Sequence, residues 1–386
     1  MPDKRSIVIF SPYSPRIGGG GAILRSLIPR LADFQVTWLY TADRDQELPG
    51  AEWIGPGLAG GSTAHDLSRA LLLWSRVEIA RLREISELLL AQSADGYWIL
   101  AHNEGTLVAR ALLRRGAAVH LSVQDDVPDG IFGRSNRYRW LAPLARPTYD
   151  ETMKSAASVD VICEGMRRYY KSRLDVDGAV VHRWLPPLGA PQPRQTVAGE
   201  LHVGHIGTIY AENEWRAFLT ALRAYASARR LKPRMTMVGL ADRYHALAAE
   251  FSNMVELVAD TPEDQAVERL RHCDFMYAMY PFDRRADVFR RTSLPTKISS
   301  YLLCQRPIFG QAPAASSLAD VLRAHPIGVL FSSAEGSATA FEAAFDAVTD
   351  LGPTVPPVAY ENARETLFGD GNVRRLTDCL MRLVNR

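Results

Sequence analysis

Short apolar runs alternate with amphipathic helical patterns along almost the whole chain. Residues 6–10 form a continuous apolar run, which is typical of a strand buried on both faces of a parallel sheet. A helical pattern over residues 22–31 follows it, with apolar side chains on one side. Further strands are predicted at residues 36–40, 97–101, 117–123 and 159–163, and a long helix is predicted at about residues 66–91. Strands that alternate with helices indicate right-handed crossovers and a parallel sheet.

The pattern restarts in the second half. Residues 186–200 are rich in proline and glycine and poor in core-forming side chains, so we interpret them as a linker. New strands are predicted at 201–206, 235–238, 255–258 and 275–279, and the chain ends in an amphipathic helix. A length of 386 residues suits two domains. We therefore predict an α/β protein with domains at 1–185 and 201–365, followed by a terminal segment at 366–386.

Composition narrows the class of protein. Hydrophobic residues make up 47% and the formal net charge is only +2, which fits a globular protein without nucleic acid as its main partner. The four cysteines are scattered, so we expect free thiols and no metal or redox pair. We find neither a signal-peptide pattern nor a long apolar run. We expect a cytoplasmic protein, and a place at the inner face of a membrane stays open.

Polar residues follow two neighbouring strands of the first half. His102 comes after one strand, and Asp125 and Asp126 come after the next. Ligands of parallel α/β sheets collect beyond such strand ends. A histidine and carboxylates there can position a hydroxyl group, accept its proton, or stabilise a developing positive charge. The alternatives are a helix cap for His102 and turn formation for the two aspartates.

Two further loops suit phosphate. Four glycines, residues 18–21, stand between the first strand and its helix, where they form either a phosphate loop or a flexible turn. In the second half Gly207 and Thr208 follow the first strand in the same way.

The segment at residues 292–309, TSLPTKISSYLLCQRPIF, predicts a polar turn, a helix and a buried strand. Pro295 fits the first turn of that helix. Free N–H groups at a helix N-terminus attract a diphosphate. Lys297 opposes the helix dipole in that turn, so it either reaches into solvent or serves an anion.

The pattern S-L-P-x-K-I-x-x-Y-L-x-x-x-x-P-I in this segment resembles the donor site of GT-B glycosyltransferases, in particular retaining family 4. The resemblance implies two doubly wound Rossmann-like domains facing one another across a cleft, with the C-terminal helix packed on the first. It also implies a nucleotide-sugar donor in the second domain, an acceptor in the first, and no metal or other cofactor. The catalytic candidates are then His102, Asp126 and Asp125. The donor-binding candidates are Gly19, Gly20, Gly207, Thr208, Arg291, Ser293, Leu294, Pro295, Lys297 and Ser300.

The chain departs from the resembled family in two respects. The family has two glutamates eight positions apart, at places that Thr292 and Ser300 occupy here. The later glutamate normally accepts hydrogen bonds from the ribose. The family also places cations after the loop that corresponds to Gly207, and this chain has none there. Lys297, Arg290 or Arg291 would have to replace them.

We therefore expect a metal-independent glycosyltransferase, acting on a glycan, lipid-linked or other hydroxyl acceptor in bacterial-type polysaccharide assembly. The alternatives are a nucleotide-sugar epimerase of the same fold and a non-catalytic binding or scaffold protein. Residues 133–140, GRSNRYRW, interleave arginine with aromatic side chains. That pattern suits an anionic lipid headgroup or a diphosphate-linked acceptor, and an ordinary solvent-facing loop is the alternative.

Overall fold

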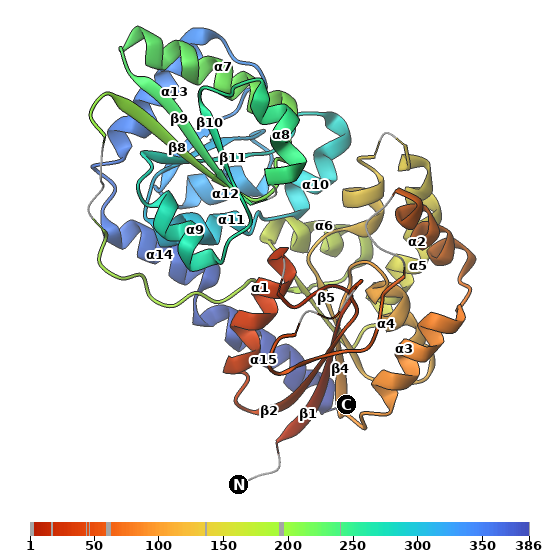
Figure 1. Ribbon diagram of the computed structural model, residues 1–386. Coiled ribbons are helices and arrows are strands. Elements are labelled where there is room, and N and C mark those ends of the chain that lie inside the picture. The colour runs from red at the N-terminus through yellow and green to blue at the C-terminus, as the bar shows by residue number, and fades with distance from the viewer. Residues whose placement is uncertain are drawn as a thin grey trace. The chain divides into compact units, whose positions relative to one another are not determined.

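The computed structural model describes residues 4–16, 18–43, 45, 47–58, 63–135, 137–192, 197–239 and 241–385. The chain forms two compact units, shown in Figure 1. The first unit comprises Met1–Leu185, Arg285–Leu294 and Phe368–Arg386, and the second comprises Pro186–Arg284 and Pro295–Leu367. Arg285–Leu294 therefore groups with the first unit, although the sequence analysis assigned this segment to the second domain.

The centre of the first unit is a seven-stranded parallel sheet in the order β3-β2-β1-β4-β5-β6-β7. All residues of β4 and β5 are buried, as expected for strands covered on both faces. The strands are β1 (Arg5–Ser11), β2 (Phe34–Tyr40), β3 (Ala51–Trp53), β4 (Gly96–Leu100), β5 (Val119–Val123), β6 (Ser158–Val161) and β7 (Ala179–Val180).

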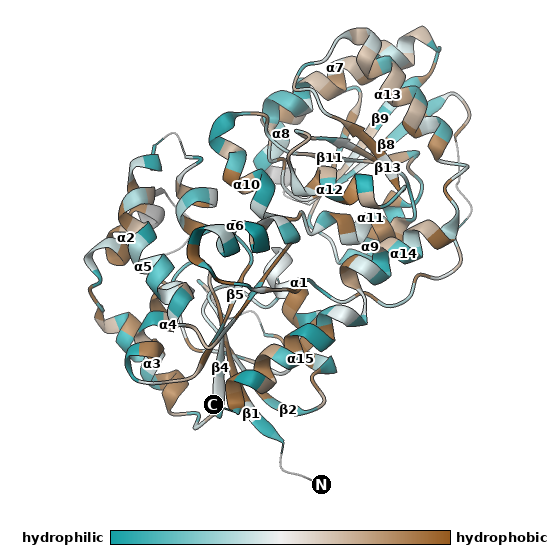
Figure 2. Cartoon of the chain, turned by 180° about the vertical axis from the view of Figure 1, so that it is seen from behind, coloured by the Kyte–Doolittle hydropathy of each residue, from teal (hydrophilic) through white to brown (hydrophobic). Residues whose placement is uncertain are grey.

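Helices cover this sheet. They are α1 (Gly18–Leu27), α2 (Thr63–Ser75), α3 (Ala80–Leu90), α4 (Gly105–Arg114), α5 (Ala142–Ser155), α6 (Glu164–Leu174), α10 (Asp287–Thr292) and α15 (Asp370–Val384), with short turns η1 (Ile28–Arg30), η2 (Val127–Phe132) and η3 (Arg139–Leu141). The C-terminal helix α15 packs against β4, β5, β6 and β7. Its brown and teal faces are visible in Figure 2, and its buried side includes Leu376, Leu380 and Leu383.

Two local predictions were wrong. Helix α1 begins at Gly18, so the four glycines form its first turn and not a loop that precedes it. The long helix expected over residues 66–91 is divided into α2 and α3, because Arg76 adopts a left-handed backbone with φ of 59°.

The second unit repeats the architecture with six parallel strands in the order β10-β9-β8-β11-β12-β13. The strands are β8 (Glu200–Ile206), β9 (Lys232–Val238), β10 (Val255–Val258), β11 (Phe275–Met279), β12 (Ile308–Gln311) and β13 (Gly328–Phe331). The helices are α7 (Glu212–Ala228), α8 (Ala241–Ala249), α9 (Glu263–Leu270), α11 (Lys297–Cys304), α12 (Ser317–Ala324), α13 (Ala338–Leu351) and α14 (Pro357–Phe368), and the turn η4 spans Arg284–Ala286.

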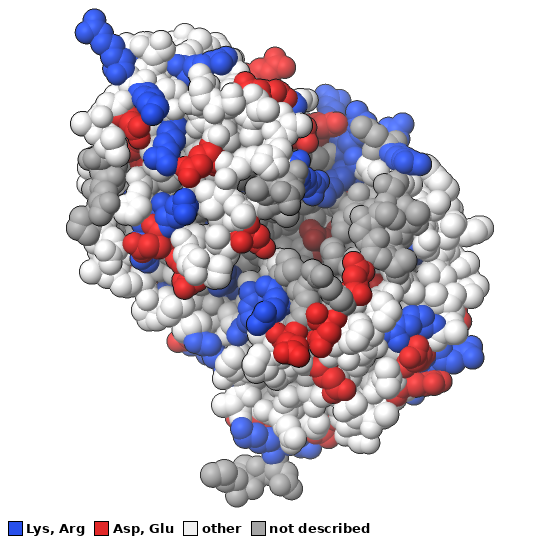
Figure 3. All heavy atoms as spheres, in the orientation of Figure 1, with Lys and Arg blue, Asp and Glu red and all other residues white. Residues whose placement is uncertain are grey.

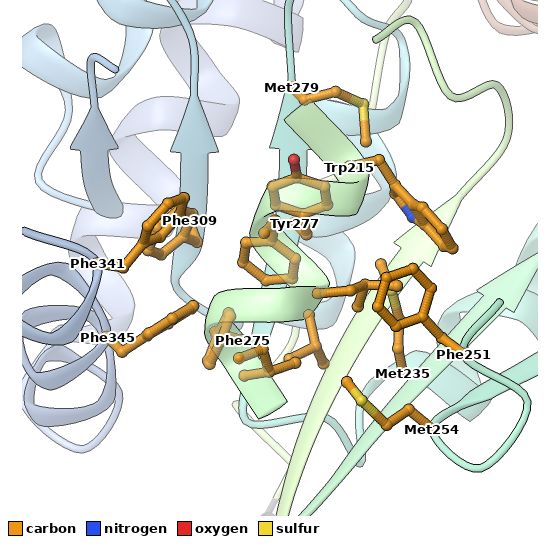
Figure 4. Close-up of a cluster of buried hydrophobic side chains, with 14 of the residues drawn as sticks. Trp215, Met235, Phe251, Met254, Phe275, Tyr277, Met279, Phe309, Phe341 and Phe345 are labelled. Atoms are coloured by element: carbon orange, nitrogen blue, oxygen red, sulfur yellow. The ribbon is translucent and has the colours of Figure 1, made fainter. Parts of the chain in front are cut away.

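Aromatic side chains fill the core of the second unit, as Figure 4 shows. The Phe218 ring of α7 stacks on Tyr277 of β11, with the ring centroids 3.8 Å apart. Phe309 and Phe345 extend the cluster, with their ring centroids 5.1 Å apart. Interdigitated rings of this kind resist displacement, so β11 is a rigid support for the groups that its backbone binds.

Each sheet has a point where the strand order reverses. In the first unit it lies between β1 and β4, and in the second between β8 and β11. Ligands of doubly wound sheets bind outside the carboxyl ends of the strands at this point. His102 follows β4, and Gly207 follows β8. The fold therefore places candidates from both halves at a position suited to ligands.

Candidate functional site

Lys297, the first residue of α11, lies inside the second unit. Lys297 is only 6% exposed, which excludes the alternative that its side chain reaches into solvent. Its Nζ donates to the backbone oxygen of Thr208, 2.7 Å away, and lies 3.3 Å from Nε2 of His205. Nζ also stands 4.7 Å from the centroid of the Tyr210 ring. The structure thus connects two predicted donor-binding residues, Lys297 and Thr208, and adds His205.

The hydrogen bonds of His205 determine its tautomer. Nδ1 lies 3.0 Å from the backbone oxygen of Tyr277, which can only accept, so Nδ1 carries the ring hydrogen. Nε2 is then the acceptor for Lys297. Burial, followed by the nearby ammonium of Lys297, lowers the pKa of His205 to about 3. At neutral pH the ring is uncharged and orients the lysine.

The surrounding fold keeps these groups in place. Tyr301 of α11 donates from its hydroxyl to the same Tyr277 oxygen at 2.7 Å, so α11 and β11 are joined beside His205. The chain turns after β8 at Gly207, whose φ of +73° favours glycine. This turn brings the Thr208 carbonyl to the lysine. The second unit's core and its candidate site therefore share β11.

Burial of a cation at this position is costly. Desolvation lowers the pKa of Lys297 to about 7, and a cation in the first turn also opposes the helix dipole. The first N–H groups of the helix are partly used, because Ile298 donates to the Pro295 oxygen and Ser299 to the Thr296 oxygen. The ammonium group of Lys297 therefore attracts an anion more strongly than the N–H groups at the start of α11 do.

Ser300, at the place of the resembled family's later glutamate, has a carboxylate beside it after all. Its hydroxyl donates to Oε1 of Glu263 at 2.7 Å. Glu263 is the first residue of α9, which packs against α11. Sequence reasoning missed this acid because it lies 37 residues before Ser300 in the chain.

His102 and Asp125 approach one another in the first unit. Nδ1 of His102 lies 3.9 Å from Oδ2 of Asp125, and the two side chains are 31% and 36% exposed, so both can meet a ligand. Desolvation lowers the pKa of His102 to about 4 and raises the pKa of Asp125 to about 6. At neutral pH the histidine is uncharged and the aspartate mostly ionised. The pair offers one acceptor of a proton and one neutral hydrogen-bonding ring.

Asp126 has a different environment from its neighbour. Its residue is 1% exposed, and Oδ1 accepts from the backbone N–H of Asp129 at 2.6 Å and of Gly130 at 3.2 Å. Its Oδ2 accepts from the Tyr170 hydroxyl at 2.7 Å. Oδ1 thus caps the turn η2, and Oδ2 ties the start of that turn to α6. Of the two aspartates, Asp125 has the geometry to meet a substrate.

The glycines of α1 are close to this pair. A Cβ on Gly20 would stand 2.3 Å from the Tyr13 hydroxyl and 2.7 Å from Oε1 of Gln124, so only glycine permits this packing. Tyr13 in turn lies edge-on to His102, with the ring centroids 5.9 Å apart. Gly19 is its neighbour in the same first turn. Tyr13, which sequence reasoning missed, therefore links the glycine turn with the candidate catalytic pair.

The remaining donor-binding candidates fall in different units. Pro295 precedes α11 in the second unit, whereas Arg291, Ser293 and Leu294 belong to the first. There Arg291 pairs with Asp287, and the Ser293 hydroxyl donates to the Phe289 oxygen at 2.8 Å. Lys297, Thr208 and Ser300 therefore belong to the second unit. Arg291, Ser293 and Leu294 belong to the first unit.

Two kinds of feature are absent from the described residues. Within the ranges that the structure describes, no group of three or more histidine, cysteine, aspartate or glutamate side chains could hold a metal ion. None of the described helices has the length and apolar character needed to cross a membrane.

The burial of Lys297 predicts how stability depends on pH. Its pKa is about 7 in the folded protein and near 10.4 in an unfolded chain, so between these values the unfolded state binds more protons. The wild-type free energy of unfolding should then rise relative to that of Lys297→Met as pH increases from 7 to 10, by up to about 1.4 kcal/mol per pH unit. Urea denaturation of both proteins at several pH values measures this difference. Lys154→Met, at an exposed position, is the control, and equal trends for all three proteins would contradict a buried ammonium.

Comparisons with known proteins agree on the fold. No family model matches the sequence, and no curated protein matches it. Three solved structures resemble the chain over nearly its whole length. Sucrose-phosphate synthase from Thermosynechococcus elongatus has a TM-score of 0.67 at 14% identity, covering 98% of each chain. WaaG, a glycosyltransferase involved in lipopolysaccharide biosynthesis, has a TM-score of 0.63 at 11% identity, covering 96% of this chain and 98% of its own.

The third is an α,α-trehalose-phosphate synthase (UDP-forming) from Burkholderia vietnamiensis, with a TM-score of 0.62 at 12% identity and coverage of 99% and 97%. Identities this low establish a common fold alone. Together with the two parallel sheets, they show that the chain has the GT-B fold, as the sequence predicted.

Proposed function

We propose that the protein is a glycosyltransferase that moves a sugar from a nucleotide-sugar donor to a hydroxyl group of a glycan, lipid-linked or other acceptor. The donor binds the second unit and the acceptor binds the first. Transfer retains the anomeric configuration and needs no metal, as the resembled family implies. The protein acts in the assembly of a polysaccharide or glycoconjugate.

One observation carries this proposal: the buried ammonium of Lys297 at the switch point of the second sheet. Within the part of the chain that the structure describes, its hydrogen-bond acceptors are the neutral Thr208 carbonyl and the neutral His205 ring. No anionic group of the described residues lies within hydrogen-bond distance of Nζ. A buried cation without an anionic partner is stabilised when an anion binds beside it. A donor diphosphate has the required charge. Lys297 thus supplies the positive charge that the loop after Gly207 lacks.

Glu263 supports the donor site in a second way. Its carboxylate, beside Ser300, replaces an acid that the resembled family carries on the helix itself. A carboxylate can accept hydrogen bonds from ribose hydroxyls, and such charge-assisted bonds are worth about 1.5–3 kcal/mol. We assign to Glu263 and Ser300 the recognition of the donor's ribose.

His102 and Asp125 support the chemical step. Asp125 is ionised at neutral pH and exposed enough to meet a substrate, so it accepts the acceptor's proton or stabilises positive charge at the anomeric carbon. His102 remains neutral and hydrogen-bonds a sugar hydroxyl. Both roles require only groups that the first unit already presents.

A panel of UDP, GDP, ADP, CMP and TDP sugars tests the proposal. One member should stabilise the wild-type protein against thermal unfolding, by about 2.7 kcal/mol at 100 times its dissociation constant. The same donor with mixed hydroxyl acceptors should give transfer that EDTA leaves unchanged, and Lys297→Met should weaken donor binding. Epimer formed without an acceptor would instead identify an epimerase, and no stabilisation by any member would favour a non-catalytic protein.

Removal of the Glu263 charge should weaken donor binding specifically. We expect Glu263→Gln to lower affinity for the donor about tenfold to a hundredfold, because a charge-assisted hydrogen bond is lost. Calorimetric titration measures the change. Glu268→Gln alters an exposed glutamate of the same helix and should bind donor normally. Equal affinity of the two variants would remove Glu263 from the site.

The two adjacent aspartates should separate function from stability. Asp125→Asn should reduce the transfer rate about 10²- to 10⁴-fold with little effect on folding, whereas Asp126→Asn should chiefly destabilise the protein. Because the pKa of Asp125 is about 6 and the ionised form acts, the wild-type rate should rise as pH increases through 6. Rate–pH profiles and thermal unfolding check both statements. Full activity of Asp125→Asn would exclude its catalytic role.

A further inference from the structure

Exposed apolar side chains gather on one part of the first unit. Of eight large hydrophobic residues that are clearly exposed in the described ranges, four lie on α2, just after it, or on η3. We call these four the tryptophan patch: Leu71, Trp74, Val77 and Trp140. Trp74 and Trp140 are each 55% exposed, and α2 packs against η3. The patch is therefore a local feature of two neighbouring elements.

Helix α2 is apolar on more than its buried side. Ala70 and Leu73 are almost fully buried, while Leu71 is 38% exposed and Trp74 more so. A helix that packs on its own protein through one side needs no further apolar side chains on the other. Figure 2 shows brown, apolar residues along this helix. The exposed side of α2 is therefore suited to bind an apolar partner.

Two arginines lie close to Trp140 in the sequence. Arg137 and Arg139 are exposed on the turn that carries it, and the Trp140 indole donates to the backbone oxygen of Arg137 at 3.1 Å, which fixes the ring beside them. Arg76, at the end of α2, pairs with Glu151 at 3.4 Å. Figure 3 shows basic side chains gathered near the place of α10 in Figure 1. The arginines of the turn therefore give the patch a positive rim.

We propose that the tryptophan patch docks on a bilayer that contains anionic phospholipids. Indole rings settle at the level of lipid headgroups, and arginines bind lipid phosphates with paired N–H groups. Burial of apolar side chains and attraction of positive charge to anionic lipids together give stable attachment to a membrane surface without a membrane-spanning helix. This inference is independent of the donor and its chemistry. It assigns Arg137, Arg139 and Trp140 to lipid binding.

Cosedimentation of the full chain with vesicles tests the proposal. The protein should bind vesicles containing phosphatidylglycerol and should bind pure phosphatidylcholine only weakly, with binding to the anionic vesicles falling as salt increases. R137Q/R139Q should weaken binding about 25-fold, at roughly a factor of five for each arginine. W74S/W140S should weaken binding by roughly tenfold for each tryptophan.

Matched controls change comparable groups elsewhere. Val358→Ser alters an equally exposed apolar residue, and R230Q/R374Q removes two other exposed charges, so both should bind vesicles like the wild type. Circular dichroism confirms that each variant is folded. Binding to neutral vesicles as strong as to anionic ones, or equal loss in the controls and the patch variants, would overturn the proposal.

A second copy of the chain is the competing occupant of the patch. Light scattering during gel filtration measures this directly. A wild-type dimer that W74S/W140S converts to a monomer, with no vesicle binding by either protein, would replace the membrane with self-association. Transfer to a water-soluble acceptor should be the same in all of these variants, because the patch does not contribute to the donor site.

Discussion

The proposed donor site depends on the cost of burying one ammonium group. A lysine at the first position of α11 opposes the helix dipole and loses its water, so its presence lowers stability unless another interaction offsets that cost. The neutral carbonyl of Thr208 and the neutral ring of His205 orient Nζ without cancelling its charge. His205 can do this because β11, fixed in an aromatic core, holds its other nitrogen. The core of the second unit therefore sets the direction of the charge.

The chain differs from the family it resembles in where its charged groups come from. A serine stands where that family has a glutamate, and the carboxylate comes from the start of a neighbouring helix instead, through Glu263. We propose that Lys297 takes the place of the cations expected after Gly207. In the proposed donor site, both replacements keep the charge and the hydrogen-bonding groups but supply them from other positions in the sequence. The groups that the sequence motif lacks are thus supplied by residues that lie elsewhere in the sequence and close to it in the structure.

Much of the architecture followed from hydrophobic periodicity, because buried parallel strands are continuous apolar runs and their helices are amphipathic. Local backbone conformation was less accessible: nothing in the helical pattern of residues 66–91 marks the left-handed Arg76 that divides it. Lys297 and the strand-end His102 could be proposed from their positions. Tyr13, His205 and Glu263 could not, because their roles depend on contacts between distant parts of the chain. His205 contacts Lys297 across 92 residues and Glu263 contacts Ser300 across 37 residues, while Tyr13 packs against the glycine turn of α1.

The direct measurement is the pH dependence of nucleotide-sugar affinity, by calorimetry between pH 6 and 9. The diphosphate diester does not titrate in this range, so any change reports on the protein. If the ammonium of Lys297 binds the diphosphate, wild-type affinity should fall above pH 7 by up to about tenfold per pH unit, as the free lysine loses its proton. Lys297→Arg, which stays charged, should lose this dependence. Affinity that is constant with pH and unchanged in Lys297→Met would contradict the account.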